Sequence, residues 1–390
     1  MRRLVILTLS LAALFTSHAQ LALDRQSRQW TVSATAGYTI PNAAKWKYVG
    51  GFGGGLDCAV RWRTDGSMEW HRLWHMPSMG LRANWNHQPG GIAGERFGLA
   101  AFLQSPIPLN LTDNNMLALE LDFGLSAYTK PYELTHAPLN EHIGSYHNCL
   151  IQAGLTYTHS IAAGGLVCAL KIVHTSNGYL MRPNQGLNYL QGEVGWQLPS
   201  TGAQQRTEAS GEPTYQHINI STDKQINRST YQHINVSTEH HKRHLWFLSY
   251  APGVVQPRYT GSKHQYYYAH TAEAGWAYAL SPRLLAGAAA DLMYNFSHDE
   301  LIEFNHDPYP LPFYGGVSLF AEPLWGPLSL RLALGCYLLK SQQPANELYN
   351  RAGLFYQLPC HGKAKPYIGV AMKNHAAHID YVEWHFGVRL

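Results

Sequence analysis

Apolar residues alternate with small or polar residues along most of this chain of 390 residues. From Leu117 to Leu125 every odd position is apolar, and the even positions are small or acidic. The segments 328–337 and 382–390 repeat the pattern. A period of two is typical of β-strands, and segments of roughly ten residues with this period are typical of transmembrane β-barrels. The pattern therefore predicts an all-β protein rather than a helical one.

A soluble β-sandwich would also alternate, but three further features favour a barrel. The alternating segments are longer than the roughly five or six residues of an average strand. Tyr and Trp cluster near the segment ends, as in the aromatic girdles of membrane barrels. The chain also stops on its last alternating segment, at the apolar residue Leu390. We therefore expect an antiparallel transmembrane β-barrel of the outer membrane, with about 12–14 strands.

Sixteen segments carry the alternation, and we expect some of them to be loops or plug segments within a single barrel domain spanning 20–390. An even number of strands is usual in bacterial barrels of this kind. The segments are 30–40, 56–63, 80–86, 95–104, 116–128, 149–159, 165–176, 188–198, 244–251, 266–280, 284–294, 313–321, 327–339, 351–357, 366–372 and 381–390.

Residues 1–19 have the features of a signal peptide. Arg2 and Arg3 form a basic start, residues 4–15 form an apolar stretch, and a small-x-small cleavage site ends at Ala19. This order is typical of secretory signals. We therefore expect a protein that is exported, with cleavage of the signal, to the cell outer membrane.

A polar stretch at about 203–244 interrupts the alternation. It contains an eight-residue repeat, in which Ile218–Thr222 recurs as Ile226–Thr230 and Ile234–Thr238. Polar repeats of this kind bury no apolar core. We therefore expect a disordered low-complexity insertion within the barrel domain.

Composition excludes several classes of protein. Charged residues make up only 14% of the chain, against about 25% in an ordinary soluble domain. The formal net charge of +4 is too small to favour nucleic acid as a partner. The five cysteines are odd in number and lack C-x-x-C spacing, so at least one is unpaired and we expect no metal site. We also expect a monomer.

One strand brings two chemically active side chains together. His174 and Ser176 share a face with Leu170 and Ile172, while Lys171 belongs to the opposite face. We expect the lysine to point into the polar lumen, which puts the histidine and the serine on the lipid-facing wall. Residues two apart in a strand lie about 6.5–7 Å from each other, so these side chains can lean into a hydrogen bond. A serine beside an imidazole is the minimum for nucleophilic acyl transfer.

The next alternating segment supplies a third polar group. Asn188 has the parity of the lipid-facing residues Leu190 and Val194, whereas Glu193 has the opposite parity. Asn188 is therefore the natural residue to orient His174 through a ring N–H. The candidates for a groove that would hold an acyl chain are Leu170, Ile172, Leu190 and Val194.

The residues around these side chains match a longer motif. They read His-Thr-Ser-Asn-Gly at 174–178 and Arg-Pro-Asn-Gln-Gly-Leu-Asn at 182–188. This resembles the lipid A 3-O-deacylase family (PagL-type, also called acyloxyacyl hydrolases), whose motif is His-x-Ser-Asn followed by Pro-Asn-x-Gly and a strand. The resemblance implies Ser176 as nucleophile and His174 as general base. It implies Asn177 or Asn184 as oxyanion donor, and we favour Asn177 because it adjoins the nucleophile.

The third position departs from that family, which has Glu fourteen residues after the histidine where this chain has Asn188. Outer-membrane phospholipase A is also similar at His-x-Ser-Asn-Gly, and that family uses Asn at the same spacing. An Asn carbonyl can accept the histidine N–H, but it lacks the negative charge that stabilises an imidazolium. The local pattern thus combines features of two families.

Three functions are compatible with these observations. The first is an outer-membrane serine esterase that uses a Ser-His-Asn triad, without a cofactor, to hydrolyse the ester-linked 3-hydroxyacyl chain of lipid A in the lipopolysaccharide of the outer leaflet. The second is an outer-membrane phospholipase A, for which the resemblance implies calcium and dimerisation. The third is a non-enzymatic pore or structural barrel, which the length of the chain supports because an eight-stranded deacylase barrel needs fewer residues.

Overall fold

The computed structural model of the chain describes residues 21–41, 48–109, 111–112, 114–178, 180–199, 244–256, 266–297, 313–340, 347–360, 362–375 and 378–390. The expected signal peptide lies outside the described residues. So does the expected insertion, except for its last residue, His244, which begins a strand.

All sixteen alternating segments are strands in the described part of the chain. Outside the strands, the described residues include three short helical segments, which are η1 (Arg25–Ser27), α3 (Glu69–Leu73) and η3 (Pro89–Gly91). The strands are β1 (Gln29–Ile40), β2 (Gly51–Arg63), β3 (Ser78–His87), β4 (Glu95–Pro106), β5 (Asn115–Tyr128), β6 (His147–Ile161), β7 (Gly164–Ser176), β8 (Leu187–Gln197), β9 (His244–Val255), β10 (Tyr267–Ser281), β11 (Leu284–Asn295), β12 (Phe313–Trp325), β13 (Leu328–Leu339), β14 (Leu348–Gln357), β15 (Lys365–His375) and β16 (His378–Arg389). Among the described residues, no helix is long and apolar enough to cross a membrane.

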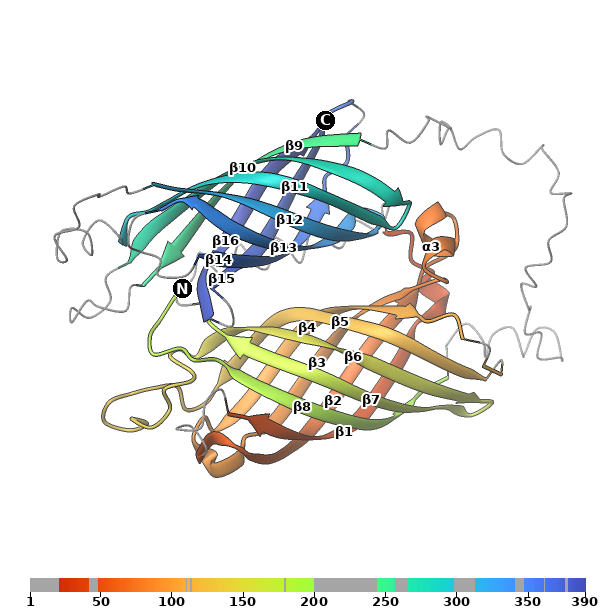
Figure 1. Ribbon diagram of the computed structural model, residues 1–390. Coiled ribbons are helices and arrows are strands. Elements are labelled where there is room, and N and C mark those ends of the chain that lie inside the picture. The colour runs from red at the N-terminus through yellow and green to blue at the C-terminus, as the bar shows by residue number, and fades with distance from the viewer. Residues whose placement is uncertain are drawn as a thin grey trace, which may run out of the picture.

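The described strands close into two barrels, each of eight antiparallel strands (Figure 1). In the N-terminal barrel β1 pairs with β8, from Thr31 opposite Gln197 to Ile40 opposite Asn188. In the C-terminal barrel β16 pairs with β9. The expected antiparallel barrel architecture is confirmed, but the expectation of one barrel with about 12–14 strands is wrong. Alternation shows where strands lie, whereas closure depends on which strand each edge pairs with, and a period of two carries no signal for that.

The side chains in both barrels are arranged inside out relative to a soluble protein. Outward-facing apolar residues are exposed, such as Phe52 at 81% and Leu319 at 71%. Inward-facing charged residues such as Arg96 and Lys171 are buried. An apolar outer wall around a polar interior is the arrangement that a hydrocarbon environment requires.

Charged side chains fill the lumen of the N-terminal barrel. The buried guanidinium of Arg82 contacts four carboxylates, and Lys171 Nζ lies 2.6 Å from Glu193. An eight-stranded barrel has an interior that side chains just fill, so these ion pairs take the place of an apolar core. The four carboxylates and their distances from Arg82 are Asp57 at 2.7 Å, Glu120 at 2.7 Å, Asp122 at 2.9 Å and Glu193 at 3.3 Å.

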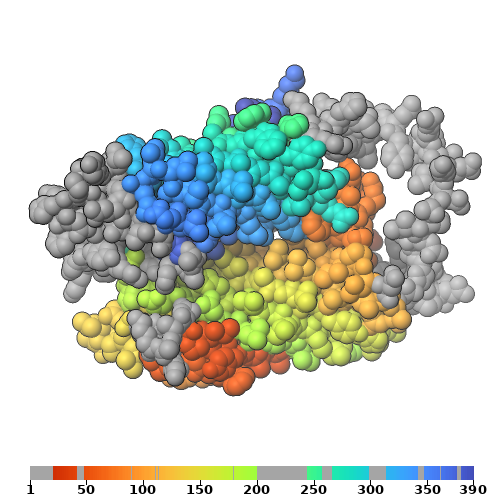
Figure 2. Space-filling model, viewed as in Figure 1, coloured from red at the N-terminus to blue at the C-terminus, as the bar shows by residue number. Residues whose placement is uncertain are grey.

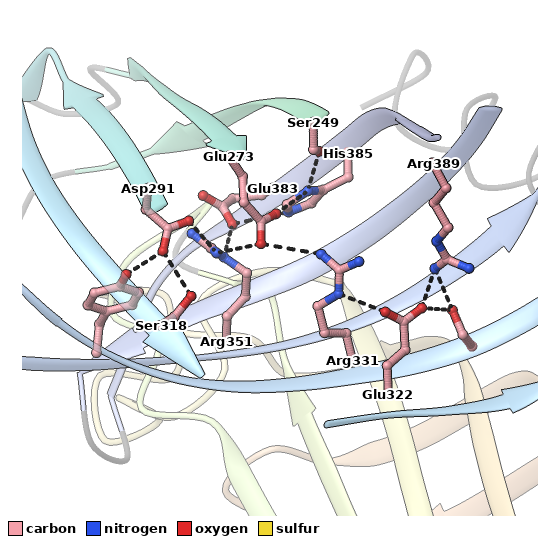
Figure 3. A network of polar contacts seen from close by, with 12 residues as sticks. Ser249, Glu273, Asp291, Ser318, Glu322, Arg331, Arg351, Glu383, His385 and Arg389 are labelled. Atoms are coloured by element: carbon pink, nitrogen blue, oxygen red, sulfur yellow. Dashed lines mark hydrogen bonds and ion pairs between the residues drawn. The ribbon is translucent and has the colours of Figure 1, made fainter. Parts of the chain in front are cut away.

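The C-terminal barrel has an independent network of the same kind (Figure 3). Arg351 lies 3.0 Å from Asp291 and 2.8 Å from Glu383. Arg331 lies 2.9 Å from Glu322 and stacks on three phenylalanine rings. The third of the functions considered above was a pore or structural barrel, which the length of the chain supported. The strands beyond the first eight form a second barrel, and paired charged side chains fill its interior.

The two barrels lie side by side and pack against each other at the end where β2 turns into β3 (Figures 1 and 2). Trp74, which follows α3, stacks on Trp325 of the C-terminal barrel with ring centroids 4.8 Å apart. Its Nε1 donates to the Leu324 carbonyl oxygen at 2.6 Å. Trp325 Nε1 donates in return to Ser105 Oγ at 3.1 Å. Aromatic rings with satisfied N–H groups thus connect the barrels.

The network around Arg82 predicts a large loss of stability on substitution. Arg82→Met removes the positive partner of four buried carboxylates, and breaking a buried ion pair costs about 3–5 kcal/mol. Urea unfolding of the refolded protein in detergent is expected to show a midpoint well below that of the wild type.

The control for this measurement is Arg25→Met, because Arg25 lies in η1 on the exposed surface. Its free energy of unfolding is expected to stay within about 0.5 kcal/mol of the wild-type value. Equal midpoints for the two variants would contradict a structural role for the Arg82 network.

Candidate active site

Strands β7 and β8 bring the three polar residues onto the outer wall of the N-terminal barrel. The register places His174 directly opposite Asn188, and Ser176 follows two residues later on the same face. Lys171 points into the lumen, where it pairs with Glu193. These inward positions agree with the parity expected for both strands, so alternation fixes which residues face lipid.

The three side chains form a continuous chain of contacts. His174 Nδ1 lies 2.7 Å from Asn188 Oδ1. His174 Nε2 lies 3.0 Å from Ser176 Oγ. With the Asn188 carbonyl oxygen as acceptor, Nδ1 carries the ring hydrogen and Nε2 is left to accept the serine proton. This is the tautomer that a general base requires.

A packed layer in the lumen supports these residues from behind. Thr175 lies between His174 and Ser176, and its hydroxyl is 2.6 Å from the hydroxyl of Tyr128. That tyrosine also contacts the Tyr189 hydroxyl at 2.9 Å. These rings belong to a buried apolar cluster in the same half of the barrel. The inward side chains therefore restrict the backbone that carries the outward ones.

The expected groove residues all lie on the exposed outer wall beside the three polar side chains. Ser176, in contrast, is only 2% exposed. The nucleophile candidate thus lies buried at the end of an apolar outer surface. The exposed fractions are 58% for Leu170, 61% for Ile172, 44% for Leu190 and 59% for Val194.

The loop between β7 and β8 carries both candidate oxyanion donors. The Asn177 backbone N–H donates to Asn184 Oδ1 at 3.1 Å. Asn177 Nδ2 donates to Ser145 Oγ at 3.1 Å and to the Met181 carbonyl oxygen at 2.8 Å. Asn184 Nδ2 is buried without a hydrogen-bond partner in the described part of the chain. Of the two residues, Asn184 has the donor group that remains available for a ligand.

Several residues that sequence reasoning missed hold this loop in place. The backbone N–H groups of Gln185 and Gly186 donate to the carbonyl oxygens of Glu141 and His142. His142 Nδ1 lies 3.0 Å from the Gly186 carbonyl oxygen, and burial lowers the pKa of that imidazole. No sequence signal marks the 141–145 segment, because its contacts depend on how two loops meet.

Gly186 could have been singled out, because it lies in the motif just before a strand. Its φ is +70°, a value that residues other than glycine rarely adopt, and a Cβ there would lie 3.0 Å from His174 Cε1. A glycine is therefore needed at this position both for its backbone conformation and for the space that it leaves to the histidine.

The fold and the site together define a membrane barrel with the side-chain geometry of a serine hydrolase. Residues 56–197 match the family described as lipid A 3-O-deacylase (PagL). Residues 217–390 match the family described as acyloxyacyl hydrolase, C-terminal domain. The chain therefore belongs to the PagL family of outer-membrane enzymes and is a carboxylic ester hydrolase. The boundary between the two matches falls between the two barrels.

Solved structures give weaker likenesses. The crystal structure of the outer membrane enzyme PagL is 19% identical, with a TM-score of 0.32, and the match covers 43% of this chain and 99% of that one. A mutant porin of Rhodopseudomonas blastica is 9% identical, with a TM-score of 0.18, and the match covers 93% and 99%. No curated protein sequence matches the chain.

The crowding at Gly186 predicts that Gly186→Ala disrupts the hydrolase. The added methyl group would strain the backbone and press on the His174 ring. A displacement of about 1 Å in such a site can cost roughly a hundredfold in rate. Ester hydrolysis by the purified variant is therefore expected to fall at least about tenfold.

Gly91→Ala is the matched control. Gly91 also has a positive φ, of +64°, but nothing lies within 4 Å of a Cβ there. It carries the same type of backbone strain at a position where an added Cβ does not contact His174. Comparable losses in the two variants would show that backbone strain alone, rather than contact with His174, lowers the rate.

Proposed function

We propose that this protein hydrolyses the ester-linked 3-hydroxyacyl chain of lipid A, with Ser176, His174 and Asn188 as its triad. The proposal is carried by one observation, the continuous contact from Ser176 Oγ through the His174 ring to Asn188 Oδ1 on the outward face of the barrel. A nucleophile on this face can meet an ester that approaches within the membrane plane.

In the first step His174 Nε2 takes the Ser176 proton while Oγ attacks the ester carbonyl carbon. The carbonyl oxygen becomes an oxyanion, and we propose that Asn184 Nδ2 donates to it. An unpartnered buried amide is suited to that role, because it stabilises charge as the charge develops. Asn188 holds the ring so that Nε2 faces the serine throughout.

In the second step the tetrahedral intermediate collapses. The bond between the acyl carbon and the sugar oxygen breaks, and His174 returns the proton to that oxygen. The acyl chain remains on Ser176. A water molecule then attacks this acyl-enzyme with His174 as base again. The products are a free 3-hydroxy fatty acid and lipid A with one hydroxyl more and one acyl chain fewer.

The outer wall supports a lipid as the substrate. Leu170 and Ile172 precede His174 on the same face, and both are more than half exposed. A hydrocarbon chain lying along β7 would contact them, and each buried CH₂ group contributes about 0.8 kcal/mol. The hydrolysed bond would then lie at the end of the strand, where the polar part of an outer-leaflet lipid begins.

A phospholipid is the alternative substrate, because outer-membrane phospholipase A has an Asn at the spacing of Asn188. We propose that the protein acts as a monomer without a cofactor. Activity in excess EDTA would support the cofactor-free deacylase. Activity that appears only with added calcium, together with dimers in light scattering, would favour the phospholipase.

Ser176→Ala is expected to abolish deacylation, because it removes the nucleophile. Mass spectrometry of lipids from cells that express the wild type should show lipid A lacking one hydroxyacyl mass. The same lipid from cells that express the variant should be intact. New lysophospholipids in place of shortened lipid A would instead identify a phospholipase.

Ser249→Ala is the matched control. Ser249 Oγ also contacts a histidine, with 2.9 Å to His385 Nδ1, but both residues lie inside the C-terminal barrel (Figure 3). This variant loses a serine–histidine contact of similar length without touching the outer wall. Deacylation is expected to continue in it. If neither serine matters while both proteins are folded, the triad assignment is wrong.

Asn188 predicts a characteristic response to substitution. Asn188→Ala removes the acceptor that orients the ring, and a loss of about a hundredfold in kcat is expected, within the range that general-base catalysis contributes. Asn188→Glu keeps an acceptor and adds a negative charge that stabilises the imidazolium. Its acid limb in the pH–rate profile is therefore expected to move to higher pH, because His174 must lose its proton to act as base.

Asn188→Gln serves as the control, since it keeps the amide but moves its oxygen by one methylene. Its activity is expected to lie near that of the alanine variant. A pH–rate profile of Asn188→Glu that superimposes on the wild type would show that residue 188 does not contact the catalytic histidine.

A further inference from the structure

The loop between β7 and β8 touches the C-terminal barrel as well as its own. The Arg182 backbone N–H donates to Gln256 Oε1 at 2.7 Å. Arg182 Nε donates to the Gln256 carbonyl oxygen, also at 2.7 Å. Gln256 directly follows β9 and is buried. One residue of the second barrel thus holds both the backbone and the side chain of a residue in the active-site loop.

A second contact lies close to the nucleophile. Gly178, two residues after Ser176, has a φ of +64°, and a Cβ there would lie 2.3 Å from Val382 Cγ2 of β16. Val382 faces outward from its barrel, yet it is only 6% exposed. Phe386, on the same face of the same strand, is 55% exposed. The loop of the first barrel therefore covers this part of the second.

These contacts lie at the end of the molecule opposite the tryptophan contact of Trp74 and Trp325. Val382 pairs with Val254, which lies two residues before Gln256, so the two anchoring residues are neighbours on adjacent strands. Contacts at both ends fix the C-terminal barrel against the N-terminal one. The loop is therefore anchored by a residue of strand β16 and by the residue that directly follows β9.

We propose that the C-terminal barrel positions the oxyanion-binding loop, with Gln256 and Val382 as positioning residues. The inference rests on the proposed function. Arg182 lies two residues before Asn184, whose unpartnered Nδ2 is the proposed oxyanion donor. Gly178 lies next to Asn177, whose backbone N–H donates to Asn184 Oδ1. Holding Gly178 and Arg182 therefore limits the movement of Asn177 and Asn184, which lie one and two residues from them.

This arrangement assigns the second barrel a role in the reaction although it contributes no group to the chemistry. Loss of the anchor would let the loop move relative to Ser176, while the apolar wall on β7 and β8 stays intact. The effect should therefore fall on kcat rather than on KM. A displacement of the donor by about 1 Å is enough to cost roughly tenfold to a hundredfold.

The test compares Gln256→Ala with Gln256→Glu, which keeps an oxygen acceptor for the Arg182 N–H. Deacylation of purified lipid A in detergent is measured for each full-length variant. Gln256→Ala is expected to lower kcat at least about tenfold with KM unchanged, and Gln256→Glu is expected to restore most of the rate. Gln357→Ala, at the opposite end of the C-terminal barrel, is the control and should match the wild type.

Hydrogen exchange of the segment 180–186 provides a readout that does not need activity. Gln256→Ala should exchange faster there than the wild type, while exchange in β7 and the unfolding temperature stay the same. Wild-type kcat and wild-type exchange in Gln256→Ala would overturn the inference. If the wild type itself leaves lipid A intact, the proposed function fails, and the exchange rates still decide whether Gln256 anchors the loop.

Discussion

Backbone hydrogen bonding in hydrocarbon is the constraint on which this structure depends. An unpaired N–H or C=O group facing lipid costs several kcal/mol, so a sheet that crosses a membrane must close on itself. This chain meets the requirement twice, through the pairing of β1 with β8 and of β16 with β9. Each closed sheet then encloses a narrow interior, and buried charges must be paired there. The networks around Arg82 and Arg351 are the result.

Closure also explains how an active site can lie on an outer wall. Successive residues of β7 point alternately into the lumen and out to lipid, so one strand carries side chains of the packed interior and the proposed catalytic side chains of the outer wall. Thr175 is held inside by Tyr128, and its two neighbours are the proposed base and nucleophile. Lys171, a few residues earlier, is held by Glu193. The geometry of the site is therefore maintained by side chains that no substrate can reach.

Sequence patterns predicted the parts of this structure that depend on local order. Parity alone placed Lys171 in the lumen and His174 on the wall, because a strand leaves no other choice. The number of barrels could not be predicted, since an edge strand has the same pattern whichever strand it pairs with. Asn177 was preferred as the oxyanion donor because it lies next to Ser176 in the sequence. In the structure, however, its side-chain Nδ2 already donates to Ser145 Oγ and to the Met181 carbonyl oxygen. The contact of Gln256 lies between barrels, and no spacing in the chain encodes it.

Because the two barrels pack together, different sides of the N-terminal barrel have different surroundings within the plane of the membrane. On one side, Leu103 of β4 and Leu121 of β5 pack against the apolar cluster that contains Leu328 of the C-terminal barrel. On β7 and β8, the apolar wall remains open. A lipid diffusing in the membrane would therefore meet the proposed site over only one sector of the circumference, and its products would leave through the same sector. Neighbouring proteins that crowd this sector would slow turnover without touching any residue of the site.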